Sequence, residues 1–411
     1  MKPTGAIPHG FDRQGGMLSI AGRPVDELLE TSGGSPLFVY DWSAVERRIA
    51  RFRGAFPNID LHYAIKANPY QPLLKSISSR VDGLDVASGR ELVMALSAGA
   101  DPGHVSFAGP GKRDEEIEAA IRAGVTLNCE SDGEVGRALA IAARLHARAR
   151  LAVRVNPPFE IKGSGMRMGG GAKPFGVDSE RVPALVGCIY DAGADWRGFH
   201  IFAGSQALSA EAIIEAQRAT IHLAAALATE IGRDPPLVNL GGGFGIPYFH
   251  GEQPLDVELI GRELAKMLRE RPQALENTRF AIELGRWLVG EAGVYLTRIL
   301  DRKVSHGKLF LVTDGGMHHQ LAASGNFGQV VRRNYPVAIA NRMDQPASEE
   351  ATIVGCLCTP LDRLADDVVL PPTQVGDVVA IFMAGAYGLS ASPQAFLAQE
   401  PAREMMVGKA D

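Results

Sequence analysis

The chain has 411 residues, of which 46% are hydrophobic and 22% are charged, and its formal net charge at pH 7 is −5. This length is too great for one small core and predicts two domains. The weakly acidic balance gives no reason to expect a nucleic-acid or anionic-membrane partner, and no apolar run is long enough to span a bilayer.

Short apolar runs alternate with helical patterns in the first two-thirds of the chain. A strand-like segment at 36–41 is followed by an amphipathic stretch at 43–55. Eight further strands are then predicted, at 61–66, 83–88, 104–109, 125–131, 151–156, 198–204, 237–243 and 279–285. Strands that alternate with helices indicate a parallel sheet. Eight such units favour a (β/α)8 TIM barrel, here assigned to residues 36–285, over an open doubly wound sheet.

The pattern changes after the last of these strands. Strand-like segments continue without long helical patterns, at 293–304, 308–316, 335–341, 351–358 and 377–387. Residues 286–411 are therefore predicted to form a C-terminal β domain. The strand-like segment 16–25 is expected to pack with that domain, so residues 1–35 are treated as an N-terminal segment belonging to it.

The cysteines and the first residues bear on the compartment. The N-terminal stretch MKPTGAIPHGFDRQGG lacks the apolar core of a signal peptide, which favours the cytoplasm. Four cysteines are too few for a disulfide framework, and a reducing compartment fits them. Cys356 and Cys358 are two residues apart, which does not make a zinc site without a second pair of ligands, so no metal is expected.

The residues at the carboxyl ends of the predicted barrel strands carry the chemistry, because the active site of such a barrel lies there. Lys66 ends the first strand, and a lysine in a partly dry site can lose its proton and form a Schiff base. The run NLGGGFG at 239–245 offers backbone N–H groups to a phosphate, and Arg286 adds a charged donor. Glu283 could keep a pyridine nitrogen protonated. These are the requirements of pyridoxal phosphate.

Each of these features also has an ordinary interpretation. Most glycine runs are turns, most lysines at strand ends are solvated, and Arg154 could simply bridge carboxylates inside the barrel. Their joint placement at one end of the barrel favours the cofactor.

Several motifs together resemble the fold-type III pyridoxal-phosphate decarboxylases, which include diaminopimelate and ornithine decarboxylases. They are YAIKAN (63–68), GLDVASGREL (83–92), FAGPGKRDEEI (107–117), NLGGGFG (239–245), ELGR (283–286), GCLCTPLD (355–362) and GAYG (385–388). The resemblance runs from about residue 36 to 408. It implies a barrel followed by a β domain, in a homodimer with shared active sites. By it, Lys66 forms the Schiff base, Glu283 meets the pyridine nitrogen and Arg286 serves the phosphate or the substrate carboxylate.

The same resemblance implies further site residues. Cys358, contributed by the partner subunit, is the expected proton donor, and Tyr387 is expected beside the cofactor. The remaining expected cofactor-binding residues are Arg154, Phe202, Ser205, Gly241, Gly242 and Gly243.

The chain also departs from the family pattern. The family usually has H-x-G-S at the end of the sixth barrel strand, with the histidine stacked on the cofactor, but HIFAGSQ (200–206) places Phe202 there. Thr359 follows the expected catalytic cysteine, where an acidic residue usually helps to bind a distal amine, and the next acidic residue is Asp362. An apparent insertion, SGNFGQVVRRNYP (324–336), offers Arg332, Arg333 and Tyr335 for the distal group.

The catalytic half of the pattern is therefore kept and the distal half is altered. This combination resembles a branch that includes exosortase-associated decarboxylases and one acting on a glutamyl group tethered to a carrier protein. We expect a cytoplasmic decarboxylase with altered distal-group specificity, acting on a small-molecule, modified or carrier-tethered α-amino acid. The expected substrate-binding residues are Arg286, Arg332, Arg333, Tyr335, Thr359, Asp362 and Tyr387. The alternatives are diaminopimelate decarboxylase itself in lysine biosynthesis, an amino-acid racemase of the same fold type, or a non-catalytic relative that binds the cofactor.

Overall fold

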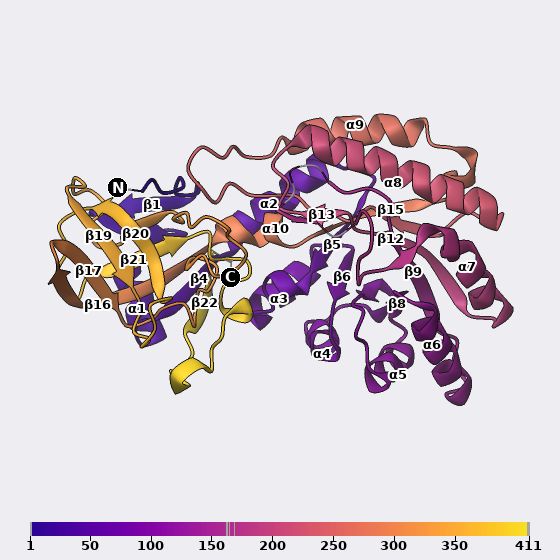
Figure 1. Cartoon of the computed structure of the whole chain (residues 1–411), viewed down its shortest axis with the longest axis horizontal. Helices are drawn as coiled ribbons and strands as arrows, with labels where there is room; N and C mark the ends of the chain where they lie inside the picture. The colour runs from indigo at the N-terminus through magenta and orange to yellow at the C-terminus, as the bar shows by residue number, and fades with distance from the viewer. Residues whose placement is uncertain (1, 162, 164, 168, 409–411) are drawn as a thin grey trace. The chain divides into compact units, whose positions relative to one another are not determined.

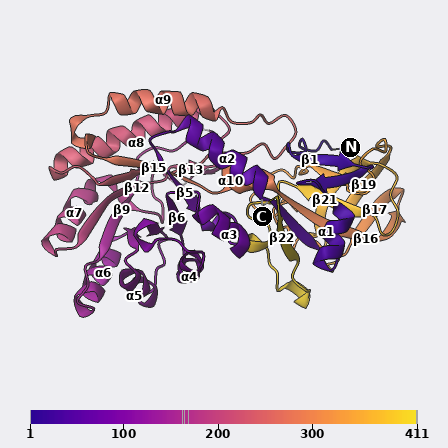
Figure 2. The same cartoon turned by 180° about the vertical axis from the view of Figure 1, so that it is seen from behind.

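A computed structural model of the chain describes residues 2–161, 163, 165–167 and 169–408. The chain divides into two compact units (Figure 1 and Figure 2). The barrel unit comprises Ile49–Gly245 and Pro254–Gly285, and the β unit comprises Met1–Arg48, Ile246–Gln253 and Arg286–Asp411. In the described parts of the chain, no helix combines the length and apolarity needed to cross a membrane.

Eight parallel strands close the barrel unit. They are β5 (Asp60–Ala64), β6 (Gly83–Val86), β7 (Val105–Phe107), β8 (Thr126–Cys129), β9 (Arg150–Asn156), β12 (Asp195–Ile201), β14 (Leu237–Asn239) and β15 (Arg279–Leu284). Each pairs with the next of this series, and β15 pairs in turn with β5, with Glu283 opposite His62. The predicted barrel is confirmed, and the open doubly wound sheet is excluded.

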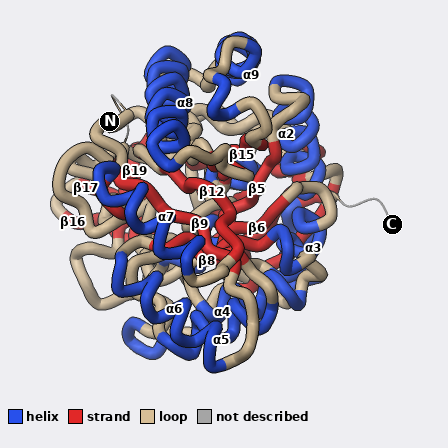
Figure 3. Tube along the Cα trace, turned by 90° about the vertical axis from the view of Figure 1, so that its right-hand side faces the viewer, coloured by secondary structure: helices blue, strands red, loops and turns tan. Residues whose placement is uncertain are grey.

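Helices lie outside this ring of strands (Figure 3). They are α3 (Gln71–Ser78), α4 (Gly89–Ser97), α5 (Asp114–Ala123), α6 (Asp132–Arg144), α7 (Val182–Asp191), α8 (Ala210–Ile231) and α9 (Val257–Arg269). Three of them begin at a serine whose hydroxyl accepts a backbone N–H three residues later: Ser88 from Glu91, Ser131 from Glu134 and Ser209 from Ala212. These N-caps let each helix start shortly after its strand ends.

The β unit is built on a mixed sheet. Its strand order is β18 (Val337–Ile339), β21 (Val378–Phe382), β16 (Gly293–Ser305), β17 (Lys308–Thr313), β19 (Glu349–Val354) and β20 (Arg363–Leu370). A three-stranded sheet of β1 (Phe11–Gln14), β2 (Met17–Ile20) and β3 (Arg23–Pro24) precedes α1 (Val25–Ser32). The short helix α10 (Arg286–Val289) follows the last barrel strand, and α2 (Trp42–Ala55) runs from the β unit into the barrel unit.

The shortest elements complete the description. They are the strands β10 (Met166–Arg167), β11 (Val177–Asp178) and β13 (Gly204–Ser205), and the 3-10 helices η1 (Ile65–Ala67), η2 (Pro102–His104), η3 (Ser179–Arg181), η4 (Gln273–Leu275), η5 (Gly290–Ala292), η6 (Leu389–Ala391) and η7 (Phe396–Ala398).

One segment differs from its predicted place. The sequence predicts a barrel that begins at residue 36, but β4 (Leu37–Asp41) pairs antiparallel with β16 and parallel with β22 (Arg403–Val407), inside the β unit. All five residues of β4 are buried, because neighbouring strands cover both of its edges. The N-terminal segment packs in the same unit: the Leu18 N–H donates to the Ala340 carbonyl at 2.6 Å.

Candidate active site

A lysine and a buried glutamate meet at the mouth of the barrel. Lys66 lies in η1, just beyond the end of β5, rather than on the strand itself. Its Nζ is 3.6 Å from Oε1 of Glu283, on the neighbouring strand β15. The Lys66 side chain is 47% exposed, whereas that of Glu283 is only 6% exposed. The amine is therefore reachable from solvent, while the carboxylate is held inside the barrel.

The surroundings of Glu283 keep its carboxylate ionised. Burial alone would raise the pKa of this carboxyl. The positive charge of Lys66, a 3.0 Å hydrogen bond from His200 Nε2 and the charge of Arg154 outweigh that effect and hold the pKa of Glu283 well below its usual range. A permanent anion is what a protonated ring nitrogen would require at this place.

Arg154 is fixed by a second buried carboxylate. Its guanidinium donates to Oε1 of Glu130 at 2.9 Å, and both side chains are buried. Glu130 also accepts the backbone N–H groups of Gly109, at 2.5 Å, and Gly176, at 3.2 Å. Phe175 lies under the guanidinium, with its ring centroid 5.1 Å away. Arg154 is thus a rigid positive charge in the barrel wall that acts on Glu283 through space.

Phe202 lies next to the lysine. The Lys66 amine is 5.7 Å from the centroid of its ring. The ring is nearly parallel to that of His200, at 6.5 Å between centroids and 7° between planes. Ser205, in β13, pairs with the short strand β10. An apolar aromatic face beside the amine is consistent with the predicted covering of a flat ring.

The glycine turn after β14 is packed against backbone on two sides. A Cβ on Gly242 would lie 1.9 Å from the carbonyl oxygen of Glu283. Gly241 and Gly243 have φ of +68° and +78°, the left-handed region that favours glycine. The Gly241 N–H is held by Oδ1 of Asn239 at 2.9 Å. Only glycine fits this turn, so its bare backbone forms a cradle of the kind that binds phosphate.

A separate cluster in the β unit surrounds Arg286, the first residue of α10. Its Nη1 donates to the Tyr248 hydroxyl at 2.9 Å, and the guanidinium carbon lies 4.8 Å from the Tyr387 ring centroid and 5.5 Å from that of Tyr248. Burial lowers the pKa of Arg286, but Tyr248, Tyr387 and Tyr335 together outweigh it and the pKa rises above its usual value. Within the described part of the chain, its buried Nε has no hydrogen-bond partner. Tyr335 packs on Tyr248, at 4.9 Å between ring centroids.

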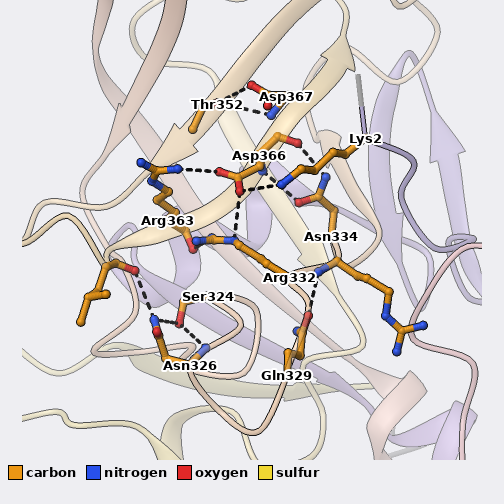
Figure 4. A network of polar contacts seen from close by, with 12 residues as sticks. Lys2, Ser324, Asn326, Gln329, Arg332, Asn334, Thr352, Arg363, Asp366 and Asp367 are labelled. Atoms are coloured by element: carbon orange, nitrogen blue, oxygen red, sulfur yellow. Dashed lines mark hydrogen bonds and ion pairs between the residues drawn. The ribbon is translucent and has the colours of Figure 1, made fainter.

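The two arginines of the apparent insertion are held by neighbours within the β unit. Arg332 contacts the Asp366 carboxylate at 3.4 Å and donates to the Arg363 carbonyl. The same carboxylate also forms an ion pair with the Lys2 ammonium (Figure 4). Arg333 donates to Glu252 at 3.0 Å, and its guanidinium carbon is 3.7 Å from the centroid of the Phe249 ring.

Asp362 has a structural function. Its carboxylate accepts the N–H of Met317 at 2.6 Å and that of Leu357 at 2.8 Å, so it joins the two loops that follow β17 and β19. Only 2% of the residue is exposed. Of the two residues that follow Leu357, Cys358 is exposed and Thr359 is half-buried. The loop that carries the expected proton donor is therefore held in place by Asp362.

Two residues of these clusters were given no role from the sequence. His200 contacts Glu283, and Tyr248 contacts Arg286. A signal for His200 exists: it lies two residues before Phe202 on a strand, and alternate strand residues face the same side. Tyr248 carried no comparable signal, because it follows the glycine turn without regular secondary structure.

A closed barrel that places a lysine amine, a buried carboxylate and a glycine cradle at one mouth meets the requirements of a pyridoxal-phosphate enzyme. The family model described as "Pyridoxal-dependent decarboxylase, pyridoxal binding domain" matches residues 42–290. The chain therefore belongs to the pyridoxal-dependent decarboxylases. It is a pyridoxal-phosphate-dependent amino-acid decarboxylase, as the sequence predicted.

Three relatives illustrate the similarity. The L-glutamyl-[BtrI acyl-carrier protein] decarboxylase of Niallia circulans is 36% identical over 370 residues, which are 88% of this chain and 86% of that protein. The diaminopimelate decarboxylase of Methanothermobacter thermautotrophicus is 31% identical over 410 residues, 96% of this chain and 92% of the relative. A crystal structure of diaminopimelate decarboxylase from M. jannaschii with L-lysine superposes with a TM-score of 0.89 at 26% identity, covering 97% of this chain and 93% of that one.

Proposed function

We propose that this decarboxylase acts on an α-amino acid whose distal end is uncharged, such as a glutamyl group tethered to a carrier protein. The observation that carries this proposal is the pairing of the charged side chains expected to meet a distal group. Asp362 is engaged by backbone N–H groups, Arg332 by Asp366 and Arg333 by Glu252. Freeing any of these charges for a substrate would leave its present partner uncompensated.

The comparisons and Thr359 support the same substrate class. The Niallia circulans relative is named for a carrier-bound glutamyl substrate. Thr359 is half-buried and its Oγ1 accepts the Leu361 N–H at 3.4 Å, so this position presents no carboxylate to a distal amine. A tethered glutamyl group ends in an uncharged linkage and needs neither an acidic nor a basic partner there.

For the chemistry, we propose the following roles for the residues of the chain. Lys66 attaches the cofactor through its amine, and Glu283 holds the negative charge that faces the ring nitrogen. Gly241, Gly242 and Gly243, together with Arg286, bind the phosphate. Phe202 covers the ring, with Ser205, Arg154 and Tyr387 completing the cofactor-binding set. The bound cofactor supplies an electron sink for the pair left when CO2 departs.

Proton delivery is the remaining step. We propose that Cys358 gives a proton to the substrate Cα after CO2 is lost, and that it acts in the active site of the partner subunit. Its exposure in the single chain supports a function toward a second chain. The Lys66 amine would then take part in releasing the product, as the nucleophile that re-forms the covalent link to a bound cofactor.

The test is CO2 release from a matched panel: a carrier protein loaded with L-glutamate, free L-glutamate and free diaminopimelate. We expect kcat/KM to be highest for the loaded carrier, and the Lys66→Ala variant to release none from any member. Fastest turnover of free diaminopimelate would instead make this a diaminopimelate decarboxylase. Loss of optical activity without CO2 would identify a racemase, and bound cofactor with no turnover a non-catalytic relative.

We further propose a homodimer with shared active sites in the cytoplasm. The dimer is supported by the apolar side chains that the insertion exposes, Phe327, Val330 and Val331, which a second chain could cover. The cytoplasm is supported by the four cysteines, which are free thiols, as a reducing compartment keeps them. The Lys66→Ala and Cys358→Ala chains, each inactive alone, should regain about 25% of wild-type activity when mixed equally, since half of the dimers are mixed and hold one intact site of two. No recovery on mixing would exclude shared sites.

A further inference from the structure

A polar cavity lies at the opposite end of the barrel from Lys66. Its volume is about 170 Å³. The rim includes Asp60 and Arg279, which are the first residues of β5 and β15, so the cavity opens at the amino-terminal ends of the strands. Farther in, its wall includes His62, Asn128 and His200. At about 30 Å³ of liquid volume each, several water molecules fit.

His200 lies between this cavity and the glutamate at the mouth. Only 3% of the residue is exposed. Its Nε2 is 3.0 Å from Oε2 of Glu283, while its Nδ1 is buried and has no hydrogen-bond partner in the part of the chain that the structure describes. Because an ionised carboxylate only accepts hydrogen bonds, Nε2 carries the hydrogen of this bond. A buried ring nitrogen without a protein partner in the wall of a cavity is a site for an ordered water.

We propose that His200 is a positioning residue for the carboxylate that faces the cofactor ring nitrogen. It orients Glu283 with one ring nitrogen, and the other nitrogen binds water in the cavity at the base of the barrel. Glu283 is thereby tied to solvent on the side of the barrel away from the substrate. The proposal rests on the function assigned above to Glu283.

The other charged groups around Glu283 show what a directional donor adds here. Lys66 approaches from η1, Arg154 acts from β9, and His62 lies opposite Glu283 on β5 but is engaged with Asp85 at 3.4 Å. Lys66 and Arg154 act on Glu283 through their positive charge. His200 adds a directional hydrogen bond that fixes the plane of the carboxylate.

A structural function alone would make different predictions, and two variants separate the cases. His200→Leu removes both ring nitrogens at a similar volume. His200→Gln keeps an N–H donor and an acceptor on one side chain, so it should restore the bond to Glu283. His62→Leu is the matched control, because it removes a second buried histidine, which contacts Asp85 instead.

The first measurement uses the full chain stripped of cofactor, with ¹³C-labelled glutamate side chains and the Glu283 signal assigned by its loss in Glu283→Gln. We expect Glu283 to titrate at a higher pH in His200→Leu than in wild type, and near the wild-type value in His200→Gln and His62→Leu. An unchanged titration in His200→Leu, or an equal change in His62→Leu, would overturn the proposal. A water cross-peak to the ¹⁵N-labelled His200 ring tests the cavity contact, and its absence would exclude the water link.

The second measurement uses the cofactor-loaded enzyme. Loss of one hydrogen bond to a charged group should lower kcat of His200→Leu about tenfold or more, with KM changed much less, and His200→Gln should recover most of it. Equal kcat losses in His200→Leu and His200→Gln would indicate packing only. Full activity of Glu283→Gln would instead refute the assigned function of Glu283 while leaving the titration result intact, so the two failures are distinguishable.

Discussion

Lys112 offers a sharp test of how the mouth of the barrel is held together. Its ammonium, in the loop between β7 and α5, donates to the Gly109 carbonyl at 2.7 Å, the Asn128 carbonyl at 2.9 Å and Oε1 of Glu134 at 2.6 Å. The side chains of Lys112 and Glu134 are 1% and 2% exposed. Lys112→Met would keep the length of the side chain and leave the Glu134 carboxylate as a buried charge without its cation.

The expected cost follows from that burial. Removing one partner of a buried ion pair costs about 3–5 kcal/mol. Glu134 retains the Glu130 N–H, which donates to its Oε2 at 3.1 Å, so we expect the lower end of that range, about 3 kcal/mol. Adding Glu134→Gln removes the charge but keeps an acceptor for the Glu130 N–H. The double variant should therefore recover about 2 kcal/mol of the free energy of unfolding.

The assay is urea-induced unfolding followed by far-UV circular dichroism, with the slope of the transition compared among variants. Lys75→Met, at an exposed lysine on α3, is the matched control and should change the free energy of unfolding by less than about 0.5 kcal/mol. The reasoning would be refuted if Lys112→Met stayed within about 1 kcal/mol of wild type, or if Glu134→Gln in that background gave no recovery.

Three further predictions concern the cofactor and acid stability. Gly242→Ala should weaken cofactor binding at least about tenfold in equilibrium dialysis, because its Cβ would lie 1.9 Å from the Glu283 carbonyl oxygen. Gly111→Ala is the control and should bind the cofactor normally, because a Cβ there meets nothing within 4 Å. Equal cofactor affinities of the two variants would contradict this reasoning. Lys66→Arg should bind cofactor without a covalent link, so hydride reduction should add no cofactor mass to the chain, and added mass would implicate another lysine. Burial and the neighbouring His319 lower the pKa of His318 from 6.5 to about 4. Its contribution to stability is therefore complete above pH 6.5 and is lost as the pH falls through 4, because the unfolded chain binds the proton first. The melting temperature of His318→Phe should fall less than that of wild type over this range, and parallel curves would exclude His318 as the cause.

The sequence predicts most of the barrel because its signal is local. Each of the eight strands is a short apolar run between helical patterns, and the rule that connects alternation to a parallel barrel needs no distant contact. By contrast, β20 was not anticipated, since Asp366 and Asp367 interrupt its apolar run. Asp366 is buried against Lys2 and Arg332, partners that no local window of sequence contains.

The candidate site also has a part that the sequence predicts and a part that only the structure shows. Lys66, Glu283 and the glycine turn could be grouped from sequence because the carboxyl ends of parallel strands converge. Asp362 shows where this reasoning ends. An acidic residue near an expected catalytic cysteine looks the same in sequence whether or not it holds backbone N–H groups, and the contacts of Asp362 with Met317 and Leu357 are seen only in the structure. The segment 37–41 presents a similar ambiguity, because a central strand of either unit is equally apolar.

The pairing of β15 with β5 also has a consequence for how the enzyme matures. Lys66 follows the first barrel strand made by the ribosome and Glu283 is on the last, so the two become neighbours only when the ring of strands is sealed. A chain that has not completed this seam has no place where one cofactor can engage both residues. Ligands that bind only the native state stabilise it, so the supply of cofactor should favour chains whose barrel is complete. Covalent capture of the cofactor would then mark the end of folding.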